Sequence, residues 1–424
     1  MLNAKQRQKF RNLAAKWMEF ANLPVMKERK RQWKAIKDLQ AEKPMILVET
    51  CMLMDYVDES EIISEDRYLR NLEKYMIETV RHGEEIQDDI VFEPYLRIPY
   101  ILDISDYGVP IESNYAQDAN GMSLGFSFNH PIKTFKDVDK LRLRSRRVDL
   151  VKTKYRKELL EDIMGDIIKI RVGGYDPFFT NEGYNPWLGC LYAGLTMDLF
   201  KLIGNENLLL WVYDNPKLIH NIMSLLRNDR IAHFQLMEKE KLLFINIDTY
   251  NPGPGSYGYV SDLPAEDRND ENIRLKDCWC WADGQEIIGH SPTMINEFFL
   301  PYTAEITNKF GLLYYGCCEG LHDRFECIEK TFTNLRAVSV SRWSNLFKMG
   351  ELIGKKYVYS RKPFPAFISS NYPNWDLLKK DIKDTLVAAK GCNLEILFRD
   401  IYTINWDRAR LKRWAEMAKN LIGC

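Results

Sequence analysis

The chain lacks any apolar run that approaches the roughly 20 residues needed to cross a membrane. Its first residues, MLNAKQRQKFRNLAAKW, form a charged amphipathic pattern without the apolar segment of a signal peptide. It also lacks an excess of either charge, since 59 Lys and Arg stand against 60 Asp and Glu. Composition therefore gives no electrostatic reason to expect nucleic acid or an anionic membrane as a partner. These absences predict a globular, cytoplasmic protein.

Compact metal and phosphate motifs are also missing. The sequence has no CxxC or HxxxH pair, and no GK[ST] follows the Gly-rich stretch GPGSYG at residues 253–258. The nine cysteines are an odd number at irregular spacings, which favours free thiols and metal ligands over a disulfide framework. A P-loop nucleotide site is therefore not expected.

Short apolar runs alternate with helical periodicity along most of the chain. Strands are expected near residues 44–52, 166–174, 242–248, 278–282, 312–318, 335–341, 356–362 and 394–401. This alternation is typical of parallel β/α units, and their number favours an α/β fold of the closed (β/α)8 TIM-barrel type. We predict an N-terminal helical extension over residues 1–43 and a barrel domain over residues 44–424. A stretch around residues 90–150, rich in Pro, Gly, Asn and Asp, is predicted to be an irregular insertion.

In such barrels the reacting groups lie at the carboxyl ends of the strands, so polar residues after each apolar run are the candidates. The candidate catalytic residues are Asp248 and Glu286. Aromatic and basic side chains beside the same strand ends predict a mouth for a flat, apolar substrate. The candidate substrate-binding residues are Tyr175, Trp279, Trp281, Tyr315 and Arg361. For Arg361, a salt bridge at the barrel rim is an equal alternative to binding an anionic group.

Two cysteines at the ends of successive predicted strands are candidate zinc ligands. Cys278 and Cys318 are 40 residues apart, and a barrel would bring them together. Glu319 is the preferred third ligand, with Asp248 and Glu286 as alternatives. The competing interpretation is that the cysteines are buried structural residues or redox-silent thiols. Because side chains alternate along a strand, we expect Cys317 and Cys318 to face opposite ways, with only Cys318 in the site.

The run HSPTMINEFFLPYTAEITNKFGLLYYGCCEG and its continuation to YSRKPFPA resemble the uroporphyrinogen decarboxylase superfamily. The likeness lies in a helix carrying EFFLPY, a strand ending in cysteine and a strand ending in serine, and it extends over most of the chain. PMILVETCMLMDYV, CWCWADGQE and YYGCCEGLHD look more like the methyltransferase branch, closest to the substrate-specific methyltransferases of corrinoid-dependent O-demethylase systems. The chain reads CMLMDYV where true decarboxylases carry an arginine-rich RQAGRY segment. It has Gly316 where the methyltransferases often carry a histidine ligand.

The resemblance implies an enzyme of anaerobic metabolism that moves a methyl group from a methoxylated aromatic to the Co(I) of a corrinoid protein, with zinc as cofactor. A phenolate leaves poorly unless its oxygen is protonated or bound to a Lewis acid, so Asp248 or Glu286 is an alternative to zinc. The expected partners are the corrinoid protein and a small aromatic methyl donor, and a homodimer is a further candidate. The alternatives are a decarboxylase of a smaller substrate and a non-catalytic corrinoid- or tetrapyrrole-binding barrel.

Overall fold

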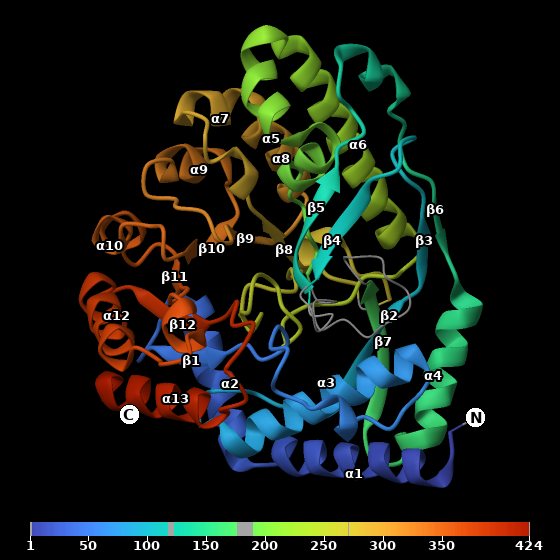
Figure 1. Ribbon diagram of the computed structural model, residues 1–424, viewed down its shortest axis with the longest axis vertical. Helices are drawn as coiled ribbons and strands as arrows, with labels where there is room; N and C mark the ends of the chain where they lie inside the picture. The colour runs from blue at the N-terminus through green and yellow to red at the C-terminus, as the bar shows by residue number, and fades with distance from the viewer. Residues whose placement is uncertain (1, 118–122, 176–189, 270, 424) are drawn as a thin grey trace.

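The computed structural model describes residues 2–117, 123–175, 190–269 and 271–423, which form a mixed α/β fold (Figure 1). Its centre is a six-stranded parallel sheet with the strand order β1-β12-β11-β10-β9-β8. These strands are β1 (Met45–Val48), β8 (Trp279–Ala282), β9 (Leu312–Tyr315), β10 (Leu335–Val340), β11 (Val358–Arg361) and β12 (Asn393–Phe398). A separate parallel pair joins β2 (Tyr95–Tyr100) to β7 (Lys169–Tyr175). The predicted parallel α/β architecture is confirmed at this level.

Helices follow most of these strands, as expected for β/α units. After β1 comes α3 (Arg67–Glu85), and after β7 come α5 (Thr196–Asp214) and α6 (Pro216–Lys239). The carboxyl-terminal half continues with α7 (Pro292–Phe298), α8 (Leu300–Thr307), α9 (Phe325–Thr331), α10 (Leu346–Ile353), α11 (Ala366–Ser369), α12 (Trp375–Ala388) and α13 (Ala409–Ile422). In Figure 1 these later helices lie along the outer side of the six-stranded sheet. No helix in the described ranges is both long and apolar enough to cross a membrane.

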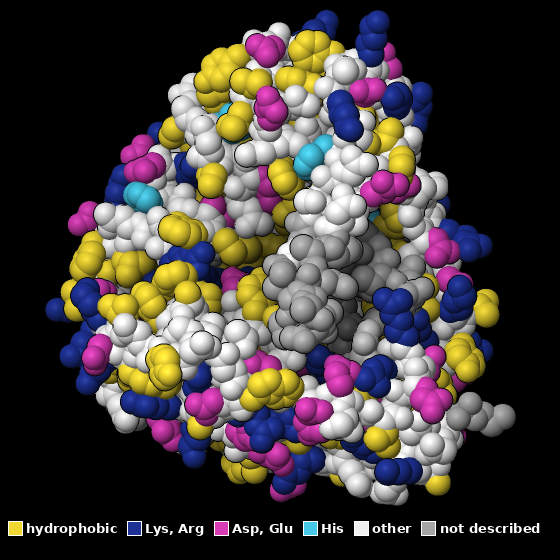
Figure 2. All heavy atoms as spheres, in the orientation of Figure 1, with side chains coloured by type: hydrophobic (Ala, Val, Ile, Leu, Met, Phe, Trp, Pro, Cys, Tyr) yellow, Lys and Arg dark blue, Asp and Glu magenta, His cyan; other side chains and the backbone are white. Residues whose placement is uncertain are grey.

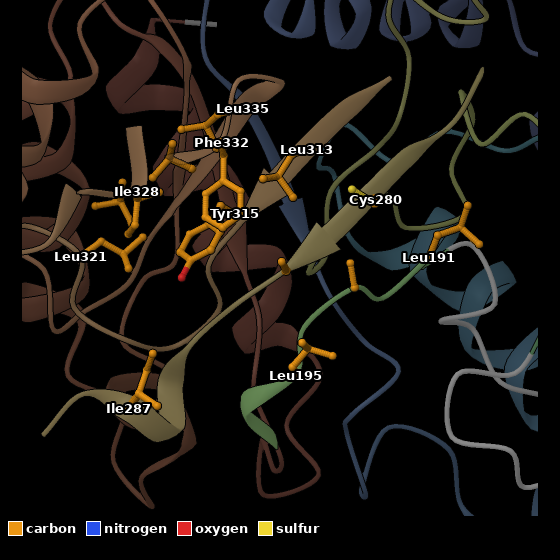
Figure 3. Packing of buried hydrophobic residues seen from close by; sticks show 14 of the residues in the cluster. Leu191, Leu195, Cys280, Ile287, Leu313, Tyr315, Leu321, Ile328, Phe332 and Leu335 are labelled. Atoms are coloured by element: carbon orange, nitrogen blue, oxygen red, sulfur yellow. The ribbon is translucent and has the colours of Figure 1, made fainter. Parts of the chain in front are cut away.

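Both faces of the sheet are buried, which is the usual state of parallel strands covered by helices. The outward side chains of β9 pack under the helices, where Leu313 and Tyr315 lie beside Phe332 (Figure 3). The inward side chains of β9, Leu312 and Tyr314, belong to a second apolar cluster. Because side chains alternate along each strand, adjacent residues enter different environments. This alternation decides which polar residues reach the interior.

The segment predicted as an N-terminal helical extension contains two helices, α1 (Ala4–Ala21) and α2 (Pro24–Lys37). Asn3 starts α1 with a capping box, and Pro24 occupies the first turn of α2. α2 is tied to the sheet because the Lys37 ammonium, fully buried, forms an ion pair with Glu395 of β12. The extension is therefore joined to the main body by a buried charge pair.

The prediction of an irregular insertion around residues 90–150 is wrong for its first part. Residues 95–100 form β2, a buried parallel strand, because the apolar residues of YLRIPY outweigh its proline at the strand end. The rest carries antiparallel pairs, β3 (Leu102–Ile104) with β6 (Arg146–Val148) and β4 (Glu112–Gln117) with β5 (Ser123–Asn129). Helix α4 (Leu150–Met164) then leads into β7.

The strand predicted at residues 242–248 is not formed as a regular strand. Its residues still lie between strands, since the Gly174 amide donates to the Leu242 carbonyl at 3.3 Å. On the other side, the Asn246 side chain donates to the carbonyl of Trp279 and accepts from its amide, at 3.1 and 2.8 Å. A side-chain amide thus replaces the backbone ladder that a strand would provide.

Candidate functional site

Three buried carboxyl groups gather just after β8 and β9. The two strands are parallel and in register, with Ala282 opposite Tyr315, and the Gly316 amide extends the pairing by donating to the Ala282 carbonyl at 2.8 Å. Residues that follow the two strands therefore meet at the same edge of the sheet. The carboxyl groups there are those of Asp283, Glu286 and Glu319.

Neutral groups hold these carboxyls in place. The Tyr192 hydroxyl donates to Asp283 at 2.7 Å, and the Thr196 hydroxyl donates to Glu286 Oε2 at 2.6 Å. Glu319 accepts the backbone amides of Gly284 at 3.1 Å and Cys317 at 2.9 Å. Within the described part of the chain, Oε1 of Glu286 is buried without a hydrogen-bond partner. That oxygen is the atom of Glu286 that is available for a further hydrogen bond.

The environment favours the protonated form of these acids. Burial is the largest cause that raises the pKa of Asp283, and the charges of Glu286 and Glu319 raise it further. Burial also raises the pKa of Glu286 and of Glu319, against the opposing hydrogen bonds from Thr196 and from backbone amides. Like charges crowded in a dry site cannot all ionise, so the cluster is suited to hold and deliver protons.

Cys317 and Cys318 lie beside this cluster with their sulfurs 3.6 Å apart. The prediction that they face opposite ways is wrong, because β9 ends at Tyr315 and Gly316 turns the chain with a φ of 96°. Hydrogen bonding with Cys317 is the first cause that lowers the pKa of the exposed Cys318 thiol. The same hydrogen bond, together with burial, raises the pKa of Cys317. Cys318 is therefore the more readily ionised thiol.

Trp281 forms an aromatic wall next to the carboxyl cluster. Its ring centroid is 4.6 Å from that of Tyr192, and its indole donates to the Gly316 carbonyl at 3.1 Å. Both side chains are partly exposed. Figure 2 shows that the face in view is hollowed near its centre, where hydrophobic and charged side chains adjoin. Trp281 thus lies beside the carboxyl cluster, and its substrate-binding role stays a prediction.

A second polar group lies on the inner side of β11 and β12. The Lys362 ammonium donates to the Tyr314 hydroxyl at 2.5 Å and to the Ser360 hydroxyl at 2.7 Å. Burial is the main cause that lowers the pKa of Lys362 to about 7. The buried Arg399 donates to Glu49 at 3.1 Å and forms an ion pair with Asp400 at 3.3 Å. The carboxylates of Glu49 and Asp400 thus already balance the positive charge of Arg399 at this edge.

The structure does not bring the predicted zinc ligands together. Cys278 precedes β8 and accepts the Gly311 amide from the start of β9, whereas Cys318 follows the far end of β9. Strand β8 has four residues, so its start and its end are about 13 Å apart. Cys278 is fully buried, with its thiol donating to the Phe244 carbonyl. The prediction that Cys278 and Cys318 share a metal is therefore wrong.

Glu319 is also a poor zinc ligand as placed, since backbone amides occupy both of its oxygens. Across the described ranges, no three His, Cys, Asp or Glu side chains are arranged to hold a metal ion. The residues present do not fit the zinc that the resemblance implies. No chemical step is assigned to zinc for this reason.

Three predicted substrate-binding residues are placed elsewhere. Arg361 points away from the interior and pairs with Asp381 of α12, which confirms the salt-bridge alternative. Tyr315 packs outward on Phe332 with ring centroids 5.1 Å apart (Figure 3). Trp279 does face inward, but it is fully buried and its indole donates to the Gly258 carbonyl at 2.9 Å. These three side chains stabilise the fold.

Asp248, a predicted catalytic residue, is held by structural partners. It accepts hydrogen bonds from the Arg97 guanidinium at 2.8 Å and the Tyr95 hydroxyl at 2.6 Å. Both partners are buried side chains of the fold, so this carboxylate is engaged in contacts within the protein. Of Tyr175, the structure describes only the backbone, which ends β7. Its side chain lies outside the described part.

Sequence reasoning named neither Asp283 nor Tyr192 as a site residue, and it considered Lys362 only together with Arg361, as a group that could hold an anion. The signal for Asp283 was the inward period of β8, since Trp279, Trp281 and Asp283 are spaced two apart. The same period places Ser360 and Lys362 on the inner side of β11 and Arg361 on the outer side. Tyr192 had no local signal, because its contact with Asp283 spans 91 residues.

Comparison with protein-family models finds no match to this chain, and comparison with curated proteins also finds none. The site is therefore interpreted from its own geometry and from the sequence resemblance.

Proposed function

We propose that this protein is a methyltransferase that moves the methyl group of a methoxylated aromatic to the corrinoid of a partner protein. The observation that carries the chemistry is the cluster of Asp283, Glu286 and Glu319, whose surroundings raise the pKa of each carboxyl. The class of reaction rests on the resemblance to corrinoid-dependent O-demethylase methyltransferases. Both point to acid-assisted cleavage of an aryl methyl ether.

Glu286 is the residue best placed to supply the proton. Thr196 satisfies its Oε2, while Oε1 remains open and buried. The methyl carbon–oxygen bond breaks with its electron pair going to oxygen, and a proton from Glu286 neutralises that oxygen. A phenol, with a pKa of about 10, is a far better leaving group than a phenolate. Burial, and after it the neighbouring Glu319, raise the pKa of Glu286 and so favour the form that carries the proton.

The corrinoid of the partner would supply the nucleophile that accepts the methyl group. This chain would orient the aromatic ring, and Trp281 beside Tyr192 offers a flat surface for it. The carbon to be transferred must face the open side of the site, because the acceptor is on another protein. A donor held against Trp281 would place its ether oxygen toward the carboxyl cluster.

We infer that the strands close into a (β/α)8 barrel, the fold class that would support this proposal. The six-stranded sheet and the pair β2–β7 supply the strands. The Asp89 amide, just before β2, donates to the Ile46 carbonyl of β1 at 3.0 Å, and residues 242–246 bridge β7 to β8. These hydrogen bonds support closure of the sheet and the β2–β7 pair into one ring. The clustered polar residues after β8 and β9 would then line the mouth.

The test is an anaerobic assay in which reduced corrinoid is mixed with the protein and a panel of methoxylated aromatics. We expect methylated corrinoid and the matching phenol with at least one donor, both lost with Glu286→Gln. The matched control is Glu297→Gln, which removes an exposed carboxyl on α7. Failure of every donor with folded wild-type protein would overturn the proposal. Release of carbon dioxide from an aromatic or pyrrole acid would instead favour the decarboxylase.

A further inference from the structure

Cys317 and Cys318 form an adjacent pair of thiols with a geometry that the proposed methyl transfer does not use. Their sulfurs are 3.6 Å apart, and both cysteines are free. Cys318 is exposed and Cys317 is partly exposed, so a small reagent can reach the pair from solvent. An S–S bond of about 2.05 Å requires the sulfurs to approach by only about 1.5 Å.

We propose that Cys317 and Cys318 are a dithiol–disulfide site that reacts with low-molecular-weight disulfides and controls the neighbouring carboxyl cluster. The part that concerns control of activity rests on the proposed function. The chemistry of the two thiols does not depend on it.

The reaction balances as two thiol–disulfide exchanges. The thiolate of Cys318 attacks one sulfur of the small disulfide, and the other sulfur leaves as a thiolate. Cys317 then loses its proton and attacks the Cys318 sulfur, which releases the second small thiol. The protein loses two electrons and two protons, and the small disulfide is reduced to two thiols. The short distance between the sulfurs favours the second, intramolecular step.

The disulfide formed here should be easily reduced. Consecutive Cα atoms lie 3.8 Å apart across a trans peptide, which is shorter than the usual separation of about 4.4–6.8 Å between bridged cysteines. Strained and exposed disulfides have the more oxidising potentials typical of labile and regulatory bonds. The site therefore suits reversible oxidation better than permanent crosslinking.

Closing this bond would disturb the carboxyl cluster through the intervening peptide. The ring formed by the disulfide contains the Cys317–Cys318 peptide unit. The carbonyl of Cys317 accepts from the Ser339 hydroxyl at 2.7 Å, and its amide donates to Glu319 Oε2 at 2.9 Å. Rotation of this peptide would break the first contact. The Cys317 amide belongs to the preceding peptide, which shares the Cys317 Cα, so the rotation would strain its hydrogen bond to Glu319.

The first test is chemical and needs no substrate. The folded protein is equilibrated anaerobically with oxidised and reduced glutathione, and its accessible thiols and proteolytic fragments are analysed by mass spectrometry. We expect the peptide carrying both cysteines to lose two hydrogens, and to regain them with dithiothreitol. Cys317→Ser and Cys318→Ser should abolish this change. The matched control is Cys327→Ser, since the thiol of Cys327 donates to the Arg324 carbonyl. This variant should still show the loss of two hydrogens.

The second test measures methyl transfer after the same treatment. We expect wild-type activity to fall at least tenfold on oxidation and to recover on reduction, whereas the activity that Cys318→Ser retains should not respond. A stable glutathione adduct on Cys318, or a bond from Cys318 to any cysteine other than Cys317, would overturn the assignment. Oxidation of the pair without any change in activity would overturn its control of the cluster. If no methyl transfer is found with any donor, the first test still decides the thiol chemistry.

Discussion

Two sets of carboxyl groups on the same sheet have pKa values that are shifted in opposite directions. After β8 and β9, Asp283 and Glu286 receive hydrogen bonds from hydroxyl groups, and burial with neighbouring acids raises the pKa of Asp283. In the middle of β12, burial also pushes the pKa of Glu395 upward, but the charges of Lys37 and Lys362 outweigh it and the pKa is lowered. The interior thus contains one carboxylate paired for stability and a cluster poised for protonation.

This difference distinguishes a carboxylate that stabilises the fold from carboxyl groups that can take part in proton transfer. A buried ion pair is costly to break and offers no proton, since its carboxylate stays charged. A cluster of acids without a fixed ammonium partner destabilises the fold but keeps its protons to a higher pH than isolated carboxyl groups do. Burial alone would not distinguish the two groups, because Asp283 and Glu319 are buried like Glu395. The partner charges are what assign each group its role.

The largest expected effect is on the poised cluster. Glu286→Gln should lower the rate of methyl transfer by about 10²–10⁴-fold, the usual contribution of a general acid. Because Glu286 must be protonated to act, the wild-type rate should fall as pH rises through its raised pKa. The residual activity of the Glu286→Gln variant should not show this fall with rising pH. A pH–rate profile that is unchanged by the substitution would remove Glu286 from this role.

The paired group should respond through stability instead. Lys37→Met leaves the Glu395 carboxylate buried beside one remaining ammonium, so we expect a loss of about 3 kcal/mol in the free energy of unfolding. Denaturant titration followed by circular dichroism measures it. Lys380→Met removes an exposed ammonium paired with Asp384 and should change stability little. Equal effects of the two variants would contradict the distinction between paired and poised groups.

Lys362 should make stability depend on pH in the alkaline range. Its pKa is lowered to about 7 in the folded protein, from an ordinary value of 10.5. Between these two values the unfolded chain binds the extra proton, so stability rises with pH by at most about 1.4 kcal/mol per pH unit. Below about pH 7 this dependence should disappear. Lys362→Met should remove it across the window, whereas Lys355→Met, an exposed control, should keep it.

The smallest effect is expected at Cys278. Its buried thiol packs below β8, far from the carboxyl cluster, so Cys278→Ala should cost about 1 kcal/mol of stability and leave activity unchanged. Metal analysis of the purified variant and wild type should give the same zinc content. A loss of bound zinc in this variant alone would restore Cys278 as a ligand.

Much of the fold could be predicted because its signals are local. Alternating apolar runs and helical periods gave the parallel α/β units, and capping residues such as Asn3 and Ser291 mark helix starts. The segment at residues 242–248 misled because its apolar composition matches a strand, while Asn246 satisfies the neighbouring backbone with its side chain. Strand identity there depends on hydrogen bonds that no sequence window contains.

The candidate site was predicted only in part. Glu286, Trp281 and Cys318 were found from their positions after strands, and the structure places them at one edge. Cys278 was misassigned because it lies at the amino end of β8, which starts at Trp279, whereas Cys318 follows the carboxyl end of β9. A shift of a few residues along a short strand moves a side chain by the full depth of the sheet.

The sequence by itself determined the strands, the helices and the supply of acids, thiols and aromatic rings near the strand ends. Only the tertiary structure decided which carboxyls meet a lysine and which meet one another. Lys37 comes from α2, Glu395 from β12 and Tyr192 from a segment 91 residues before its partner Asp283. A pKa depends on burial and on charges within a few ångströms, and those neighbours are set by packing between distant parts of the chain.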